Sequence, residues 1–80
     1  MYYVYIIKSI NFPNQFYTGC TQDLDKRLSN HNSGTTSHTE KYRPWELVMY
    51  LAFSNKEKAV DFERYLKSHS GRAFKFKRLI

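Results

Sequence analysis

The apolar run Tyr2–Ile7 constrains the fold more than any other part of the sequence. Its residues are mostly β-branched or aromatic, which favours a strand, and both of its alternating faces are apolar. A strand with two apolar faces is covered on both sides. The run therefore predicts a central strand, with other elements packed against each face of its sheet.

A second strand is expected after a turn. The segment Ser9–Asn14 is rich in turn-forming residues, and Pro13 within it has no amide hydrogen to donate to a ladder. The residues Gln15–Thr21 have strand composition, so the two strands should form an antiparallel hairpin.

Two tyrosines of this hairpin are expected on one face. Tyr5 and Tyr17 are an even number of residues apart, so both rings lie on the same side of a hairpin without a bulge. Gly19 falls on that side too. A glycine in a strand most often marks a bulge, but it also leaves room for another group to approach the backbone.

A helix is predicted over Gln22–Asn32. Thr21 is the candidate N-cap, Asp23 and Asp25 suit the positive first turn, and Gly34 lies where a chain leaves a helix.

This helix carries Arg27 and His31 four residues apart, at the edge of the face on which Leu24 and Leu28 dock. Such a stripe is more often solvated surface than part of an active site. The helix alone does not decide between the two.

The second half of the chain predicts a strand and two helices. A polar loop over Ser33–Lys41 leads to a strand over Trp45–Phe53. Ser54 and Glu57 have the spacing of a capping box for a helix that runs to about Ser68.

Ser70 and Gly71 break the chain before a short C-terminal helix. The apolar positions of this helix are Ala73, Phe76, Leu79 and Ile80. Its basic positions are Arg72, Lys75, Lys77 and Arg78. These cations form either a solvated face or a set of contacts to phosphates. The sequence thus predicts one α+β domain over residues 1–80, a small three-stranded antiparallel sheet flanked by helices in the order β-β-α-β-α-α.

Glu63 falls inside the apolar stripe of the second predicted helix. That stripe consists of Ala59, Val60, Phe62 and Leu66. An unpaired buried charge is costly, so the carboxylate must be paired, protonated or bound to a cation. Pairing with a nearby Arg or Lys is the plainer structural explanation.

Charge and composition narrow the class of partner. Thirteen Lys and Arg against seven Asp and Glu give a formal net charge of +6, which favours a polyanion such as nucleic acid. Basic domains also bind membranes or acidic proteins, so charge alone leaves these alternatives open. The single cysteine, Cys20, cannot form an internal disulfide, and there is no zinc-like cluster, secretory signal or membrane-spanning run. A cytoplasmic location is therefore expected.

The chain carries short motifs in order: Tyr3-Val4-Tyr5, Tyr17-Thr18-Gly19, Leu24–Leu28, His31–Gly34, Tyr42–Val48, Phe62–Lys67 and Ser70–Phe74. Together they resemble the GIY-YIG nuclease superfamily, and specifically its small single-domain members. The resemblance covers essentially the whole chain. Tyr3, Val4 and Thr18 depart from the tripeptide signatures, but both tyrosines and the second glycine, which carry the chemistry, are kept.

The resemblance implies metal-assisted hydrolysis of DNA phosphodiester bonds. Tyr17 would be the general base that deprotonates the attacking water, and Tyr5 would orient it. A phenol with its usual pKa of about 10 is a weak base at neutral pH, so Arg27 and the metal would have to lower that pKa. Arg27 would also stabilise the transition state, and His31 would either relay the proton from Tyr17 or contact the phosphate.

The resemblance further implies that Glu63 holds a divalent cation, Mg²⁺ or alternatively Mn²⁺, with no other cofactor. Lys67, Arg72 and Lys75 would bind the DNA backbone. So small a chain leaves little surface for reading bases, so branched, nicked or distorted DNA would be selected by its shape or by a partner protein. The main alternative is a module of the same fold that binds nucleic acid without cutting it.

Overall fold

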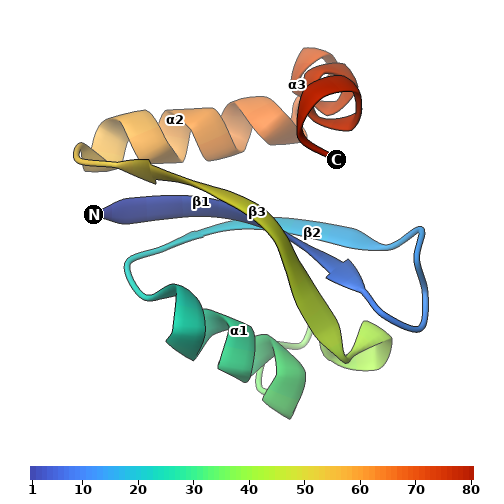
Figure 1. The fold of residues 1–80 in the computed structure, drawn as a ribbon. Helices are drawn as coiled ribbons and strands as arrows, with labels where there is room; N and C mark the ends of the chain where they lie inside the picture. Colours follow the sequence, from blue (N-terminus) through green and yellow to red (C-terminus); the bar gives the residue numbers. More distant parts are fainter.

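A three-stranded antiparallel sheet lies between two layers of helix (Figure 1). The computed structural model describes residues 1–80. The central strand is β1 (Tyr2–Ser9), and its neighbours β2 (Phe16–Thr21) and β3 (Trp45–Phe53) are the two edges. The predicted α+β class and the predicted central position of the first strand are confirmed.

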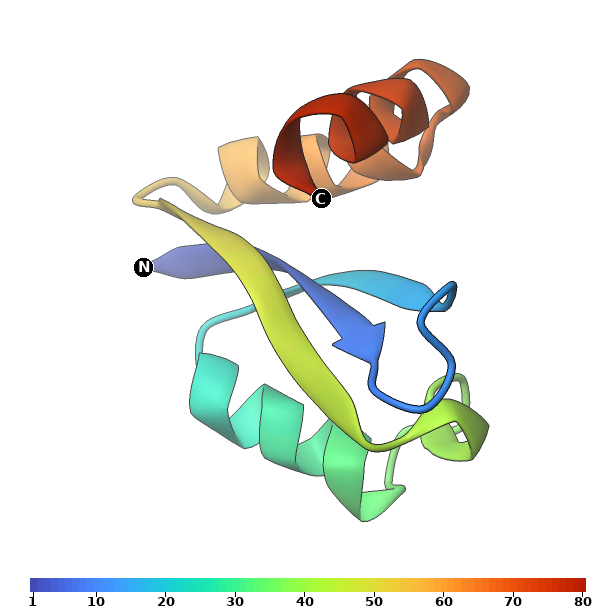
Figure 2. The ribbon, with the colours of Figure 1, turned by 45° about the vertical axis from the view of Figure 1, so that its right-hand side comes forward.

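The helices are divided between the two faces of the sheet (Figures 1 and 2). One face is covered by α1 (Leu24–Ser33), and the other by α2 (Lys56–Lys67) and the C-terminal helix. The C-terminal helix consists of α3 (His69–Phe74) and a π-helical turn, η2 (Lys75–Leu79), that continues it. A short 3-10 turn, η1 (Glu40–Tyr42), precedes β3. The element order matches the predicted β-β-α-β-α-α.

Each face of the sheet has its own core. On the α2 side the buried side chains are Val4, Ile6, Ala59 and Leu66. On the α1 side they are Tyr5, Ile7 and Trp45, with Leu24 and Leu28 packed against them. Successive side chains of β1 therefore pack into cores on opposite faces of the sheet, which is why both faces of the run Tyr2–Ile7 are hydrophobic.

The hairpin of β1 and β2 places the two tyrosines as predicted. Tyr5 lies opposite Gly19 and Ile7 opposite Tyr17, without a bulge between these strands. The ring centroids of Tyr5 and Tyr17 are 6.4 Å apart. A Cβ at Gly19 would clash with the Tyr5 hydroxyl, so this glycine makes room for the Tyr5 ring.

The start of α1 corrects a predicted cap. The N-cap is Asp23, whose carboxylate accepts from the amide of Lys26 at 3.0 Å. Thr21, the predicted N-cap, instead accepts from the amide of Asp23 at 3.1 Å in the turn before the helix. Gly34 ends the helix as predicted, with a left-handed φ of 82°.

The later helices carry two further corrections. Asn55, and not Ser54, caps α2, because its side chain accepts from the amide of Lys58 at 3.1 Å. The pair Ser70 and Gly71 lies inside α3 and does not break the chain. The break falls at Ser68, which ends α2 and caps α3.

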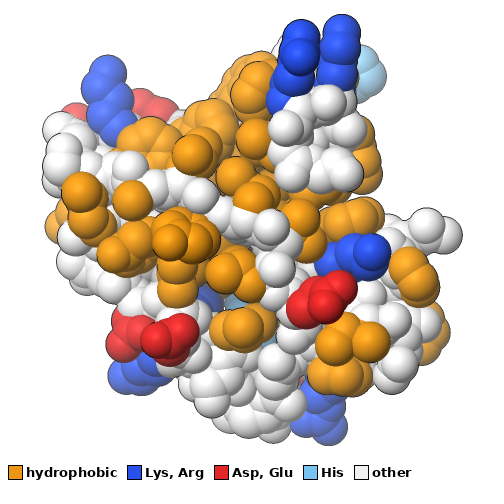
Figure 3. All heavy atoms as spheres, viewed as in Figure 1, with side chains coloured by type: hydrophobic (Ala, Val, Ile, Leu, Met, Phe, Trp, Pro, Cys, Tyr) orange, Lys and Arg blue, Asp and Glu red, His pale blue; other side chains and the backbone are white.

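Several apolar side chains of the edge strand β3 are exposed to solvent. Figure 3 shows hydrophobic side chains spread over β3 and α2, with Lys and Arg mostly at the margins. The exposed apolar residues of β3 include Leu47, Val48, Tyr50 and Leu51. None of the helices has the length and hydropathy needed to cross a bilayer.

Candidate active site

Of the predicted site residues, Arg27 lines hollows in the surface near the C-terminal end of β2. A hollow of about 400 Å³ there is lined by Tyr2, Cys20, Thr21, Gln22, Arg27, Lys56 and Val60. A second hollow of about 290 Å³ shares Thr21, Gln22 and Arg27 and adds Asp23, Lys26 and Asn30. Arg27 of α1 therefore stands between two open depressions, one of which reaches α2.

A buried hydrogen-bonded chain lies beneath this surface. The hydroxyl of Tyr5 is 2.9 Å from His31 Nε2, and His31 Nδ1 is 2.8 Å from Thr39 Oγ1. All three side chains are at most 1% exposed. Both ring nitrogens of His31 are thus occupied by protein groups, and the imidazole has no open side for a phosphate.

Tyr17 lies beside this row of hydrogen-bonded side chains, on the edge strand β2, and is half-buried. Its ring centroid is 4.9 Å from that of His31. The ammonium of Lys67, from α2, lies 6.0 Å from the centre of the Tyr17 ring. Tyr17 therefore has the buried imidazole on one side and a cation from the opposite helical layer on the other.

Arg27 lies beside both phenols. Burial lowers the pKa of Arg27, but hydrogen bonding and charge interactions with Tyr5 and then Tyr17 raise it more, so the guanidinium stays charged. Its Nε is buried and has no hydrogen-bond partner in the protein. The side chain as a whole is half-buried and lines both hollows, so part of the guanidinium is open to solvent.

The two buried titratable groups have shifted pKa values. Burial raises the pKa of Tyr5 to about 12, although hydrogen bonding and charge from Arg27 oppose the shift. Burial, and then the charge of Arg27, lowers the pKa of His31. At neutral pH Tyr5 therefore keeps its proton and His31 is uncharged.

Glu63 is half-buried on α2 and forms an ion pair with Lys67, one turn further on. The distance between Glu63 Oε2 and Lys67 Nζ is 2.7 Å, and the side chains are 22% and 50% exposed respectively. The pairing with a lysine that the sequence left open is therefore present. The charge of Glu63 also acts to raise the pKa of both Tyr5 and Cys20, so the carboxylate lies within electrostatic reach of the tyrosines.

The donor set around Glu63 fits a weakly held oxygen-seeking cation. No group of three or more His, Cys, Asp or Glu side chains forms a dedicated metal cage. A single accessible carboxylate suits Mg²⁺, which keeps most of its waters and binds substrate phosphate as well.

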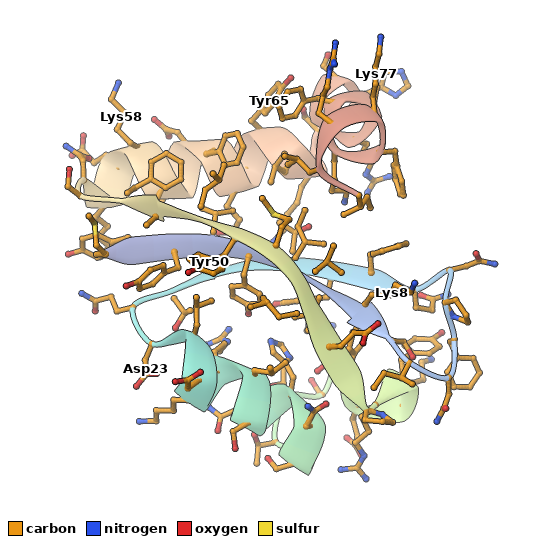
Figure 4. The ribbon with its side chains drawn as sticks, in the orientation of Figure 1. Lys8, Asp23, Tyr50, Lys58, Tyr65 and Lys77 are labelled. Atoms are coloured by element: carbon orange, nitrogen blue, oxygen red, sulfur yellow. The ribbon has the colours of Figure 1, made fainter.

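The three residues predicted to bind the DNA backbone, Lys67, Arg72 and Lys75, lie near one another but differ in exposure. Burial, and then the charges of Arg72 and Lys67, lowers the pKa of Lys75, so these three basic groups are neighbours. Lys75 is only 9% exposed, whereas Arg72 and Lys67 are open to solvent. Lys77 points away from the sheet on the outer side of the C-terminal helix (Figure 4), so the basic positions of this helix do not form one face.

Thr39 was missed by the sequence reasoning. It lies in a segment predicted only as a polar loop, and no spacing rule links it to His31. The observation that identifies it is its buried contact with the imidazole, which depends on the path of the loop from α1 to β3.

Comparisons with known proteins agree with the fold. The family model of the GIY-YIG catalytic domain matches residues 1–77. UPF0213 proteins of Streptococcus pyogenes serotypes M3 and M1 are each 36% identical over 74 residues, which cover 91% of this chain and 78% of the relative. The solution NMR structure of the UPF0213 protein BH0048 from Bacillus halodurans is 33% identical, with a TM-score of 0.56, covering 96% of this chain and 84% of that one.

The fold and the family match thus define a nuclease domain, for which DNA is the implied substrate. The chain belongs to the GIY-YIG family, and its relatives are the UPF0213 proteins, small single-domain members of that family. The resemblance predicted from the ordered motifs is confirmed.

Proposed function

We propose that this protein is a metal-dependent endonuclease that hydrolyses DNA phosphodiester bonds at the β2 edge of its sheet. The observation that supports the proposal is the set of neighbours of Tyr17: Arg27 interacts with its phenol, and Lys67, which is paired with Glu63, lies 6.0 Å from its ring. These residues come from a strand and from helices on opposite faces of the sheet. A general base, a guanidinium and a carboxylate at one accessible edge are the groups that phosphodiester hydrolysis requires.

Tyr17 is the general base in this proposal. As the phenolate it takes a proton from a water molecule, whose oxygen bonds to phosphorus in line with the leaving oxygen. The bond between phosphorus and the leaving oxygen breaks, and that oxygen takes a proton from solvent. Tyr5 is a poorer candidate, because it is 1% exposed and burial raises its pKa to about 12. The position of Tyr17 at the edge, beside Arg27 and Lys67, supports its role.

Arg27 stabilises the charge that develops on the phosphate oxygens. Its planar guanidinium can donate to two oxygens at once. Arg27 is half-buried and lines two surface hollows, which supports this role because a phosphate can reach the guanidinium there.

Glu63 would hold the divalent cation, Mg²⁺ or Mn²⁺, which when bound supplies positive charge for the leaving oxygen. With a cation on Glu63, Lys67 would be free to contact a backbone phosphate. Arg72, its exposed neighbour, would extend the positive surface along the DNA, whereas Lys75 is 9% exposed and would add positive charge from behind that surface.

His31 acts through Tyr5 and does not touch the phosphate. The full burial of the imidazole and the occupation of its nitrogens by Tyr5 and Thr39 support a role in orienting Tyr5, because neither nitrogen is free to take a proton from Tyr17 or to contact the phosphate. Selection of branched, nicked or distorted DNA rests on shape or on a partner protein, because the site offers few groups that could read bases.

The test is cleavage of end-labelled branched, nicked and linear DNA with Mg²⁺, with Mn²⁺ and with a chelator. We expect metal-dependent cleavage that falls by about 10²-fold or more in Tyr17→Phe and in Glu63→Gln. The matched controls are Tyr50→Phe on β3 and Glu57→Gln on α2, both exposed, which should keep the wild-type rate. Salt-sensitive binding without cleavage of any of these DNAs would contradict the proposal and support the non-catalytic module.

A further inference from the structure

We propose that Thr39 is a positioning residue, whose hydroxyl accepts the Nδ1–H of His31 and holds the imidazole in the tautomer whose Nε2 accepts the Tyr5 proton. The catalytic meaning of this inference rests on the proposed nuclease function. The tautomer itself is a property of the folded protein and can be tested without DNA.

The geometry leaves two directions for the hydrogen bonds. The Tyr5–His31 distance of 2.9 Å and the His31–Thr39 distance of 2.8 Å fit either tautomer of a neutral imidazole. All three groups are buried, so solvent does not supply alternative partners. The direction therefore follows from the groups at the two ends of the chain.

At the Tyr5 end the neighbour is Arg27. A guanidinium has only donors, and Arg27 lies close enough to Tyr5 to lower its pKa against the effect of burial. Beside a group that can only donate, the single proton of Tyr5 is directed to His31 Nε2. The opposite tautomer would present a second donor to Tyr5 and leave the phenolic proton without an acceptor.

At the Thr39 end the neighbour is a backbone carbonyl. The oxygen of Thr36 lies 3.4 Å from Thr39 Oγ1 and can only accept. The hydroxyl proton of Thr39 points to this carbonyl, which leaves a lone pair for the Nδ1–H of His31. Both ends therefore require the same tautomer, with the imidazole proton on Nδ1.

Thr39 is held in place by the start of β3. The indole Nε1 of Trp45 donates to the carbonyl of Thr39 at 2.9 Å. The side chain of Asn32, on the same helix as His31, accepts from the Trp45 amide at 2.5 Å and donates to the Trp45 carbonyl at 3.1 Å. The loop is thus tied back to α1, and the hydroxyl is fixed relative to the imidazole that it positions.

The test reads the tautomer directly. Long-range ¹H–¹⁵N spectra of ¹⁵N-histidine-labelled protein are recorded above pH 7 for the wild type, Thr39→Val, Thr39→Ser and Tyr5→Phe. We expect His31 to show a protonated Nδ1 and a bare Nε2 in the wild type, in Thr39→Ser and in Tyr5→Phe. Thr39→Val, which keeps the shape and loses the hydroxyl, should lose this preference.

A wild-type His31 with its proton on Nε2 would overturn the proposal. So would a Thr39→Val spectrum that keeps the wild-type pattern, or loss of the pattern in Tyr5→Phe. If Thr39→Val does not fold, the spectra of the wild type and Tyr5→Phe still decide the question.

The rate of DNA cleavage gives a second readout. Thr39→Val should slow cleavage by about tenfold or more, and Thr39→Ser should restore the rate, because the serine keeps the accepting hydroxyl. Equal rates in the wild type and Thr39→Val would count against the positioning role. If the wild-type protein cuts no DNA, the nuclease proposal fails. The spectra still test which nitrogen of His31 carries the proton.

Discussion

Tyr5 and Tyr17 are the same chemical group in different surroundings. Both rings lie on one face of the hairpin, as their even spacing predicts. Tyr5 is buried under its neighbours and bonded to His31, whereas Tyr17 is open at the strand edge. The sequence could place the two phenols together, but it could not predict which one solvent reaches, because that depends on how α1 and α2 close over the sheet.

The stability of the fold should depend on pH through His31. Burial, and then Arg27, lowers the pKa of the folded imidazole, so the unfolded chain, with an ordinary pKa of about 6.5, binds a proton that the folded chain does not. Stability therefore falls as the pH decreases through about 6.5. We expect the midpoint of thermal unfolding to decrease from pH 7 to pH 5, with a smaller decrease in His31→Gln.

The control for this prediction is His38→Gln, in the exposed loop. It should keep the wild-type dependence on pH. A pH dependence in His31→Gln equal to that of the wild type would show that the buried imidazole is not the group responsible.

The helices were predictable as elements, but their ends were not. Thr21 and Asp23 are both good caps, as are Ser54 and Asn55, and local preference does not choose between such neighbours. The choice is made by packing against the sheet. Gly71 is the clearest case, because the sequence predicts a chain break there and the residue instead lies inside α3, in contact with the end of α2.

Gly71→Ala should destabilise the protein although alanine is the better helix former. A Cβ at Gly71 would clash with the carbonyl of Tyr65 at the end of α2. We expect a loss of about 1–3 kcal/mol in the free energy of unfolding by urea, which exceeds the gain of about 1 kcal/mol from helix propensity. Ser70→Ala, exposed in the same helix, is the control and should change stability little. An alanine variant as stable as the wild type would contradict this packing.

At the scale of the whole molecule, the candidate site spans the sandwich. Arg27 belongs to α1, below the sheet in Figure 1, and Glu63 to α2, above it, and the charges of both act on the pKa of Cys20 in β2. The sequence predicted both residues, because Glu63 interrupts an apolar stripe and Arg27 belongs to an ordered motif. It could not predict that both side chains lie near β2, because that depends on how α1 and α2 pack against opposite faces of the sheet.

The most direct test of the account is whether groups from opposite layers act on one phosphate. Single-turnover cleavage of DNA with Mg²⁺ should be measured for Arg27→Lys, Glu63→Gln and the double variant, with exposed Arg64→Lys as the control. We expect each single variant to lose about 10²-fold or more in rate, and the double variant to be about as slow as the slower single one. Single variants at the wild-type rate, or losses that multiply in the double variant, would contradict a shared site.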